Sequence, residues 1–123
     1  MKLYLAGPMT GYKDFNFPAF HKAAAELRAA GHVVFSPAEK DIESYGVDLF
    51  KGEGSQKAIE GKFNLRGALA QDLEFICLEA DGIALMLGWE RSKGANAENA
   101  TAVAIGLKRI FQDIDGNWVG VGQ

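Results

Sequence analysis

The sequence predicts one α/β domain built on a Rossmann-like or flavodoxin-like parallel sheet of four to five strands, with helices on both faces. Short apolar segments alternate along the chain with longer segments whose apolar residues recur at helical spacing. Loops that contain glycine, proline or serine separate them. A chain of 123 residues, 48% of them hydrophobic, suits a single core. We therefore expect residues 1–123 to form one domain.

The first half of the chain begins with a strand, a helix and a second strand. The segment "KLYLAG" (2–7) is typical of a buried strand, and the Gly-Pro pair that ends it cannot continue a sheet ladder. In "FPAFHKAAAELRAAGH" (17–32) the apolar residues fall on one helical face, with a proline in the first turn and a glycine at the end. The segment "HVVFSP" (32–37) predicts the second strand.

Residues 38–62 lose this pattern. Acidic residues, glycines and isolated aromatic residues alternate in "AEKDIESYGVDLFKGEGSQKAIEGK". A segment of this length without clear periodicity is more often a surface excursion or a lid than part of a core. We expect an irregular loop or lid here.

The second half returns to the alternation. Leucine and isoleucine recur at helical spacing in "NLRGALAQDLEFICLEA" (64–80), and "GIALML" (82–87) is continuously apolar, as strands buried on both faces are. A helix over 94–109 and a fourth strand over 110–114 are predicted to follow. The tail from 115 is interpreted either as an edge strand or as a segment that reaches a neighbouring subunit.

Composition excludes several classes of protein. A net charge of -3 and scattered Lys and Arg residues disfavour binding to a nucleic acid polymer. The amino-terminal segment contains too few apolar residues for a signal peptide or a membrane span. We therefore expect a cytoplasmic protein without membrane contact. Cys77 is expected to be a buried thiol, and His21 and His32 to be structural, because neither has ligand-type neighbours. No metal and no organic cofactor are expected.

Three loops should meet at the carboxyl edge of the sheet, where ligands bind in such folds. The loop after the third strand places Ser92 and Gly94 just before a helix, whose first N–H groups can hold a phosphate or another anion. A serine that only caps the helix is the alternative. The candidate substrate-binding residues in the first and third loops are Gly7, Pro8, Met9, Gly11, Gly88, Trp89, Ser92, Gly94 and Asn96.

Glu98 is the most informative residue. An exposed structural glutamate usually has Lys or Arg three or four positions away, but these positions hold Gly94, Ala95, Thr101 and Ala102. Small neighbours leave space for a ligand beside the carboxylate. A carboxylate near an anion site is suited to act as a nucleophile or to stabilise a cationic carbon.

Two further residues are candidates with open alternatives. Asp72 interrupts the apolar stripe of its helix, although an exposed helix residue explains it equally well. Tyr4 lies inside the first strand, where it either packs in the core or hydrogen-bonds a carboxylate.

The motifs "LYLAGPMTG" and "GWERSKGANAENATAVAIGL" resemble the nucleoside 2-deoxyribosyltransferase-like superfamily. Within it, the chain is most similar to a group of small, mostly phage and bacterial, DUF4406-like proteins, which share the patterns "AGPMTG" and "GWxxSxGAxxE". The resemblance covers nearly the whole chain except residues 40 to 62.

The resemblance implies a glutamate nucleophile, Glu98, that attacks the anomeric carbon of a nucleoside sugar and displaces the base. It also implies that Asp72 helps to bind the sugar and that Tyr4 orients the nucleophile. Transferases that act on free nucleosides commonly have aspartate where this chain has Ser92, whereas the related hydrolases of nucleoside 5'-monophosphates have serine. A hydroxyl can donate to phosphate and a carboxylate would repel it, so a 5'-nucleotide is the expected ligand.

The expected function is therefore cleavage or transfer at the N-glycosidic bond of a (deoxy)nucleoside 5'-monophosphate or nucleoside. The alternatives are a non-catalytic nucleotide sensor or sequestering protein on the same fold, and an interaction protein that docks a partner through residues 38–62. The resemblance further implies a homodimer or a larger homo-oligomer.

Overall fold

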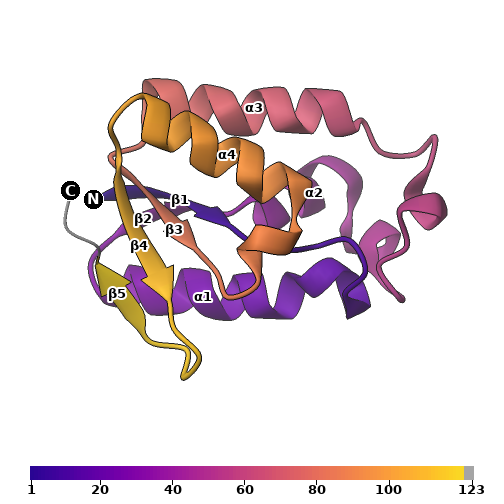
Figure 1. The fold of residues 1–123 in the computed structure, drawn as a ribbon. Coiled ribbons are helices and arrows are strands. Elements are labelled where there is room, and N and C mark those ends of the chain that lie inside the picture. The colour runs from indigo at the N-terminus through magenta and orange to yellow at the C-terminus, as the bar shows by residue number, and fades with distance from the viewer. Residues whose placement is uncertain (121–123) are drawn as a thin grey trace.

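A computed structural model describes residues 1–120 of the chain and confirms the predicted α/β class (Figure 1). Five strands form one sheet in the order β2-β1-β3-β4-β5. β1 to β4 are parallel, and β5 pairs with β4 in the antiparallel direction. The strands are β1 (Lys2–Ala6), β2 (Val33–Phe35), β3 (Gly82–Leu85), β4 (Lys108–Gln112) and β5 (Trp118–Gly120).

Helices cover both faces of the sheet. α3 and α4 lie side by side on one face, and α1 lies on the other (Figure 1). The α-helices are α1 (Phe17–Ala29), α2 (Pro37–Tyr45), α3 (Leu65–Leu78) and α4 (Lys93–Ala104). Short 3-10 helices occupy the connections: η1 (Lys13–Asn16), η2 (Val47–Phe50), η3 (Gln56–Ile59) and η4 (Trp89–Arg91).

Alternation along β1 divides the core into two layers. Leu3 and Leu5 belong to the apolar cluster on the α1 side, whereas Tyr4 and Ala6 belong to the cluster on the α3 and α4 side. This follows from the two-residue period of a strand, which sends successive side chains to opposite faces. The position of Tyr4 therefore places its ring under α3 and α4.

The strand order creates a crevice between β1 and β3. The chain leaves β1 to form β2 on one side and later returns to form β3 on the other side. The place where the strand order changes direction is the switch point of the sheet. In sheets of this order, ligands bind there, outside the carboxyl ends of the strands. The loops after β1, β2 and β3 meet there, as the sequence predicts.

The structure differs from the predicted elements in three places. The segment 38–62, expected to be irregular, contains all of helix α2 except its first residue, and Phe50 and Ile59 of this segment are buried in the core. α4 ends at Ala104 instead of continuing to residue 109, because Gly106 takes a positive φ of 78° that terminates the helix and lets β4 begin earlier. The expectation of a buried Cys77 was wrong: the residue is exposed. Residues 121–123 of the tail lie outside the described residues.

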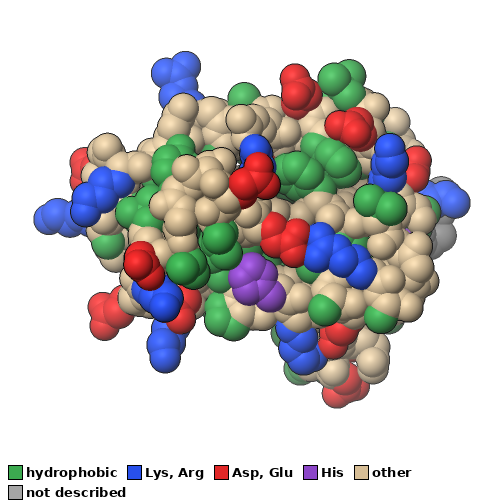
Figure 2. All heavy atoms as spheres, turned by 180° about the vertical axis from the view of Figure 1, so that it is seen from behind, with side chains coloured by type: hydrophobic (Ala, Val, Ile, Leu, Met, Phe, Trp, Pro, Cys, Tyr) green, Lys and Arg blue, Asp and Glu red, His purple; other side chains and the backbone are tan. Residues whose placement is uncertain are grey.

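Charges are mixed on the surface. On the face shown in Figure 2, Lys and Arg side chains are interspersed with Asp and Glu side chains. None of the helices within residues 1–120 is long and apolar enough to cross a membrane.

Candidate active site

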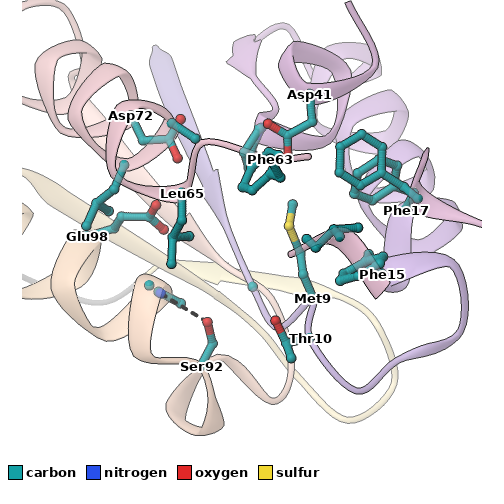
Figure 3. Close-up of a pocket in the computed structure, with 18 of the residues that line it drawn as sticks. Met9, Thr10, Phe15, Phe17, Asp41, Phe63, Leu65, Asp72, Ser92 and Glu98 are labelled. Carbon is teal, nitrogen blue, oxygen red and sulfur yellow. Dashed lines mark hydrogen bonds between the residues drawn. The ribbon is translucent and has the colours of Figure 1, made fainter. Parts of the chain in front are cut away.

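A pocket opens at the crevice between β1 and β3 (Figure 3). Its cavity measures about 150 Å³. By this measure one water molecule needs about 10–15 Å³, so the cavity has space on the order of ten water molecules, which suits a small organic ligand. Asp72 and Glu98 lie along one part of the wall, and aromatic side chains lie along another, together with Asp41 (Figure 3). A polar reacting group and a flat apolar group can therefore bind in it together.

A tyrosine and a glutamate form the innermost contact of the pocket. The Tyr4 hydroxyl donates a hydrogen bond of 2.7 Å to Oε2 of Glu98. Tyr4 is fully buried in β1, and Glu98 on α4 is only 6% exposed. Burial raises the pKa of Tyr4 well above its usual range, so its hydroxyl remains a donor. This bond fixes the direction in which the Glu98 carboxylate faces the cavity.

Asp72 completes a cluster with this pair. It lies on α3, is 9% exposed, and lines the pocket beside Glu98. Burial raises the pKa of Asp72 to about 6, while Tyr4, Glu98 and Lys40 oppose the increase. Burial, followed by the charge of Asp72, raises the pKa of Glu98 well above its usual range. The pair therefore holds a proton to a higher pH than two exposed carboxyl groups would.

Asp41 is a third carboxylate of the pocket, and the sequence analysis missed it. It lies on α2, is 8% exposed, and points into the cavity from the side opposite Glu98 (Figure 3). Burial, followed by the charge of Asp72, raises the pKa of Asp41 to about 7. A signal was present in the loop "SPAEKD": the Ser-Pro pair starts a helix, and Asp41 lies one turn after Pro37 on the same face.

Ser92 and the start of α4 form the polar end of the pocket. The Ser92 side chain accepts a hydrogen bond of 3.1 Å from the Ala95 N–H, which makes it the N-cap of the helix. The hydroxyl hydrogen of Ser92 stays available to donate. The N–H groups of Lys93 and Gly94 belong to the first turn and have no partner within the helix. The capping interpretation and the anion interpretation are therefore compatible.

Two loops close over the pocket together. Gly11 N–H donates to the Gly54 carbonyl at 2.8 Å, and Asp14 N–H donates to the Gly52 carbonyl at 2.7 Å. Gly54 has a positive φ of 77°, and a Cβ there would overlap the carbonyl of Tyr12. These contacts place the segment after α2 against the first loop. That segment supplies Phe50, Gln56, Ile59 and Phe63 to the pocket wall.

The predicted site residues separate into two groups. Those that line the pocket are Tyr4, Gly7, Met9, Asp72, Ser92, Gly94 and Glu98. Those that do not line it are Pro8, Gly11, Gly88, Trp89 and Asn96.

The residues outside the lining hold the loops in shape. Asn96 donates to the carbonyls of Glu90 and Ser92, which supports the turn before α4. Gly88 has a positive φ of 88°, and Trp89 packs against Phe111. In contrast, Gly7 lines the pocket, and its backbone passes so close to Met86 that a Cβ at this position would lie 2.8 Å from the Met86 sulfur.

Although three carboxylates line the pocket, no group of three His, Cys, Asp or Glu residues within 1–120 is placed to hold one ion. The chemistry available to the described residues is that of a carboxylate nucleophile, protonated carboxyl groups and hydroxyl donors.

The fold and the pocket together define a small α/β domain with a carboxylate-rich ligand pocket at the switch point of its sheet. Residues 1–111 match the family described as "Domain of unknown function (DUF4406)", and the chain belongs to this family. This confirms the DUF4406-like part of the resemblance. A search of curated proteins finds no match, and neither does a search of solved structures.

Proposed function

We propose that this protein cleaves or transfers the N-glycosidic bond of a (deoxy)nucleoside 5'-monophosphate or nucleoside, with Glu98 as the nucleophile. The observation that carries the proposal is the buried hydrogen bond between Tyr4 and Glu98, beside Asp72, at the switch point of the sheet. Burial of a carboxyl group without a cation beside it is costly for stability, so the position of Glu98 in a pocket favours a chemical role. The site would act in the cytoplasm, as the sequence predicts.

The reaction begins with attack of a Glu98 carboxylate oxygen on the anomeric carbon of the sugar. A bond from that oxygen to the carbon forms, the carbon–nitrogen bond breaks, and its electron pair goes to the leaving base. The base takes a proton from the carboxyl cluster, whose raised pKa values favour the protonated form of one of its groups. Asp72 holds the sugar beside this carbon.

The second step releases the sugar from the enzyme. In hydrolysis, a water oxygen attacks the same carbon, its proton passes to a carboxylate of the cluster, and Glu98 leaves as a free carboxylate. In transfer, a second base takes the place of water. The Tyr4 hydroxyl stabilises the Glu98 carboxylate at the start and end of this cycle by donating to it.

The direct test is incubation of the full chain with deoxynucleosides, ribonucleosides and their 5'-monophosphates, with and without a second free base. Base release is followed by chromatography. Release of a base from any of these classes of substrate supports the proposal. Formation of a new nucleoside with the second base identifies transfer. Saturable nucleotide binding without any base release over hours would instead support a sensor or sequestering protein.

The role of Ser92 in binding phosphate gives a separate prediction. Aspartate caps helices as well as serine does, but its charge repels phosphate. We expect Ser92→Asp to weaken binding of the 5'-monophosphate at least about tenfold while changing the free energy of unfolding by less than about 0.5 kcal/mol. Calorimetric titration and denaturant unfolding measure the two effects.

The matched variant separates capping from phosphate binding. Ser92→Ala removes the cap as well, so it should lower the free energy of unfolding by about 1 kcal/mol. Binding of the corresponding nucleoside, which has no phosphate, should be nearly unchanged in Ser92→Asp. Equal loss of nucleoside and nucleotide binding in Ser92→Asp would contradict the assignment of phosphate to this end of the pocket.

A further inference from the structure

The proposed reaction needs a proton donor on the far side of the sugar from Glu98. A carboxylate nucleophile attacks the anomeric carbon from one face, and the base departs from the opposite face. The base receives the electron pair of the broken carbon–nitrogen bond, so a proton delivered to it at this moment lowers the barrier. The donor therefore has to lie across the cavity from Glu98, on the wall that the base faces.

Asp41 occupies this position. Its side chain lies across the cavity from Glu98, on the same part of the wall as Phe63 (Figure 3). The aromatic wall continues from Phe63 to Phe50 at 5.7 Å between ring centroids, and from Phe50 to Phe17 at 4.8 Å. Flat ligands such as nucleobases bind against aromatic rings. With the sugar beside Glu98, the base extends toward this wall and the Asp41 carboxyl group.

The other proton donors near Glu98 are placed differently. Asp72 lies on the same part of the wall as Glu98, so it faces the sugar from the side of the attack (Figure 3). The Tyr4 hydroxyl is fully buried and donates its proton to Glu98 at 2.7 Å. Neither group lies on the side from which the base departs.

The surroundings of Asp41 keep a proton available. Its side chain is 8% exposed, and burial, followed by the charge of Asp72, raises the pKa of Asp41 to about 7. Lys40, the preceding residue, opposes this increase. A carboxylic acid whose pKa is near the operating pH combines a substantial protonated fraction with easy proton transfer. Asp41 can therefore give a proton in the first step and take one back in the second.

We infer that Asp41 is the general acid of the reaction, the catalytic residue that gives its proton to the departing base. This inference rests on the proposed function, because it uses the sugar position beside Glu98. The O–H bond of Asp41 breaks as the carbon–nitrogen bond breaks, and the proton goes to a ring nitrogen or a carbonyl oxygen of the base. The Asp41 carboxylate that remains takes a proton from the water, or from the second base, that attacks in the second step.

The test compares two substrates, of which only one needs this proton. The base of 7-methyl-2'-deoxyguanosine 5'-monophosphate is already cationic and leaves as a neutral molecule, whereas the base of 2'-deoxyguanosine 5'-monophosphate has to be protonated. We expect Asp41→Asn to slow base release from the unmethylated nucleotide by at least about 10²-fold, and from the methylated nucleotide by about threefold or less. Single-turnover rates, corrected for spontaneous release, measure both effects.

A second pair serves if the chain accepts pyrimidines only. The fluorinated base of 5-fluoro-2'-deoxyuridine 5'-monophosphate is a better leaving group than the uracil of 2'-deoxyuridine 5'-monophosphate. The loss of rate in Asp41→Asn should therefore be smaller for the fluorinated nucleotide.

Two further variants keep the result interpretable. Glu98→Gln should slow both members of a pair, because both need the nucleophile. Asp48→Asn changes an exposed aspartate of the segment after α2 and should leave both rates at the wild-type value. Circular dichroism shows whether each variant is folded.

The possible results separate the inference from the function on which it rests. Base release by the wild-type chain supports the proposed function, whatever the effect of Asp41→Asn. Unchanged rates in Asp41→Asn, or an equal loss for both members of a pair, would overturn the inference. A loss confined to the unmethylated nucleotide in Asp72→Asn, and not in Asp41→Asn, would overturn it in favour of Asp72. Absence of base release from every nucleotide in the wild-type chain would overturn both proposals.

Discussion

Glu98→Gln will abolish base release while nucleotide binding persists. Glutamine has the shape of glutamate, and its carbonyl oxygen can still accept the hydrogen bond that Tyr4 donates to Glu98 at 2.7 Å. The amide nitrogen and oxygen cannot form the glycosyl ester, however, so the covalent step is lost. We expect release to fall by at least about 10³-fold, as for other enzymes that lose their nucleophile. Chromatographic rates under single-turnover conditions measure this fall.

The same experiment has a matched control on the neighbouring helix. Glu74 lies on α3, two positions after Asp72, and is exposed. Glu74→Gln removes the same charge without touching the pocket, so its rate should equal that of the wild-type chain. If Glu98→Gln released base at the wild-type rate, the nucleophile would have to be another group. Tight binding in Glu98→Gln would show that the pocket remains intact.

The sequence predicted the part of the site that depends on local pattern. Glu98 could be recognised because uncharged, mostly small residues surround it, and the structure shows Ala95 and Ala102 buried on the same side of α4. Ser92 could be recognised because an N-cap has a local signature. The role of Asp72 was ambiguous, because the sequence pattern is the same whether a polar residue within an apolar stripe faces a pocket or solvent. Burial at 9% resolves this ambiguity.

The sequence could not predict the features that depend on contacts between distant segments. The Ser-Pro pair signals the start of the helix that carries Asp41, but Asp41 reaches the pocket because α2 packs against α1, and no pattern within residues 38–62 reports that packing. The aromatic wall has the same origin: Phe50 and Phe63 meet Phe17 through tertiary packing. The early end of α4 was signalled by Gly106, but a helix tolerates an isolated glycine in many contexts, so the sequence alone did not place the end.

The carboxylate cluster also predicts how the free energy of unfolding depends on pH. The pKa of Asp41 is raised from its ordinary 3.8 to about 7, and that of Asp72 to about 6. The folded state therefore holds these protons more tightly than the unfolded state. Stability is greatest below the unfolded pKa values and is lost as the pH rises toward the folded values. This dependence is opposite in sign to that of carboxylates in salt bridges.

We expect the free energy of unfolding to fall by about 3 kcal/mol between about pH 5 and about pH 8. At about 1.4 kcal/mol per pH unit and group, Asp41 and Asp72 could each contribute more than 1 kcal/mol over this interval. Part of the pKa shift of Asp41 comes from the charge of Asp72 and depends on the protonation state of Asp72, and water in the open cavity reduces both contributions. Denaturant unfolding at a series of pH values measures the fall.

Substitution of Asp41 isolates its share of this stability cost. Asp41→Asn removes a buried ionisable group and keeps its volume, so it should raise the free energy of unfolding by about 2 kcal/mol at about pH 8 and change it little at about pH 5. The exposed Asp48→Asn should follow the wild-type curve at both pH values. A wild-type curve that rises with pH would mean that Asp41 is paired with a cation in solution. A buried carboxyl group that weakens the fold at neutral pH and lines the pocket is suited to contact a ligand rather than to stabilise the fold.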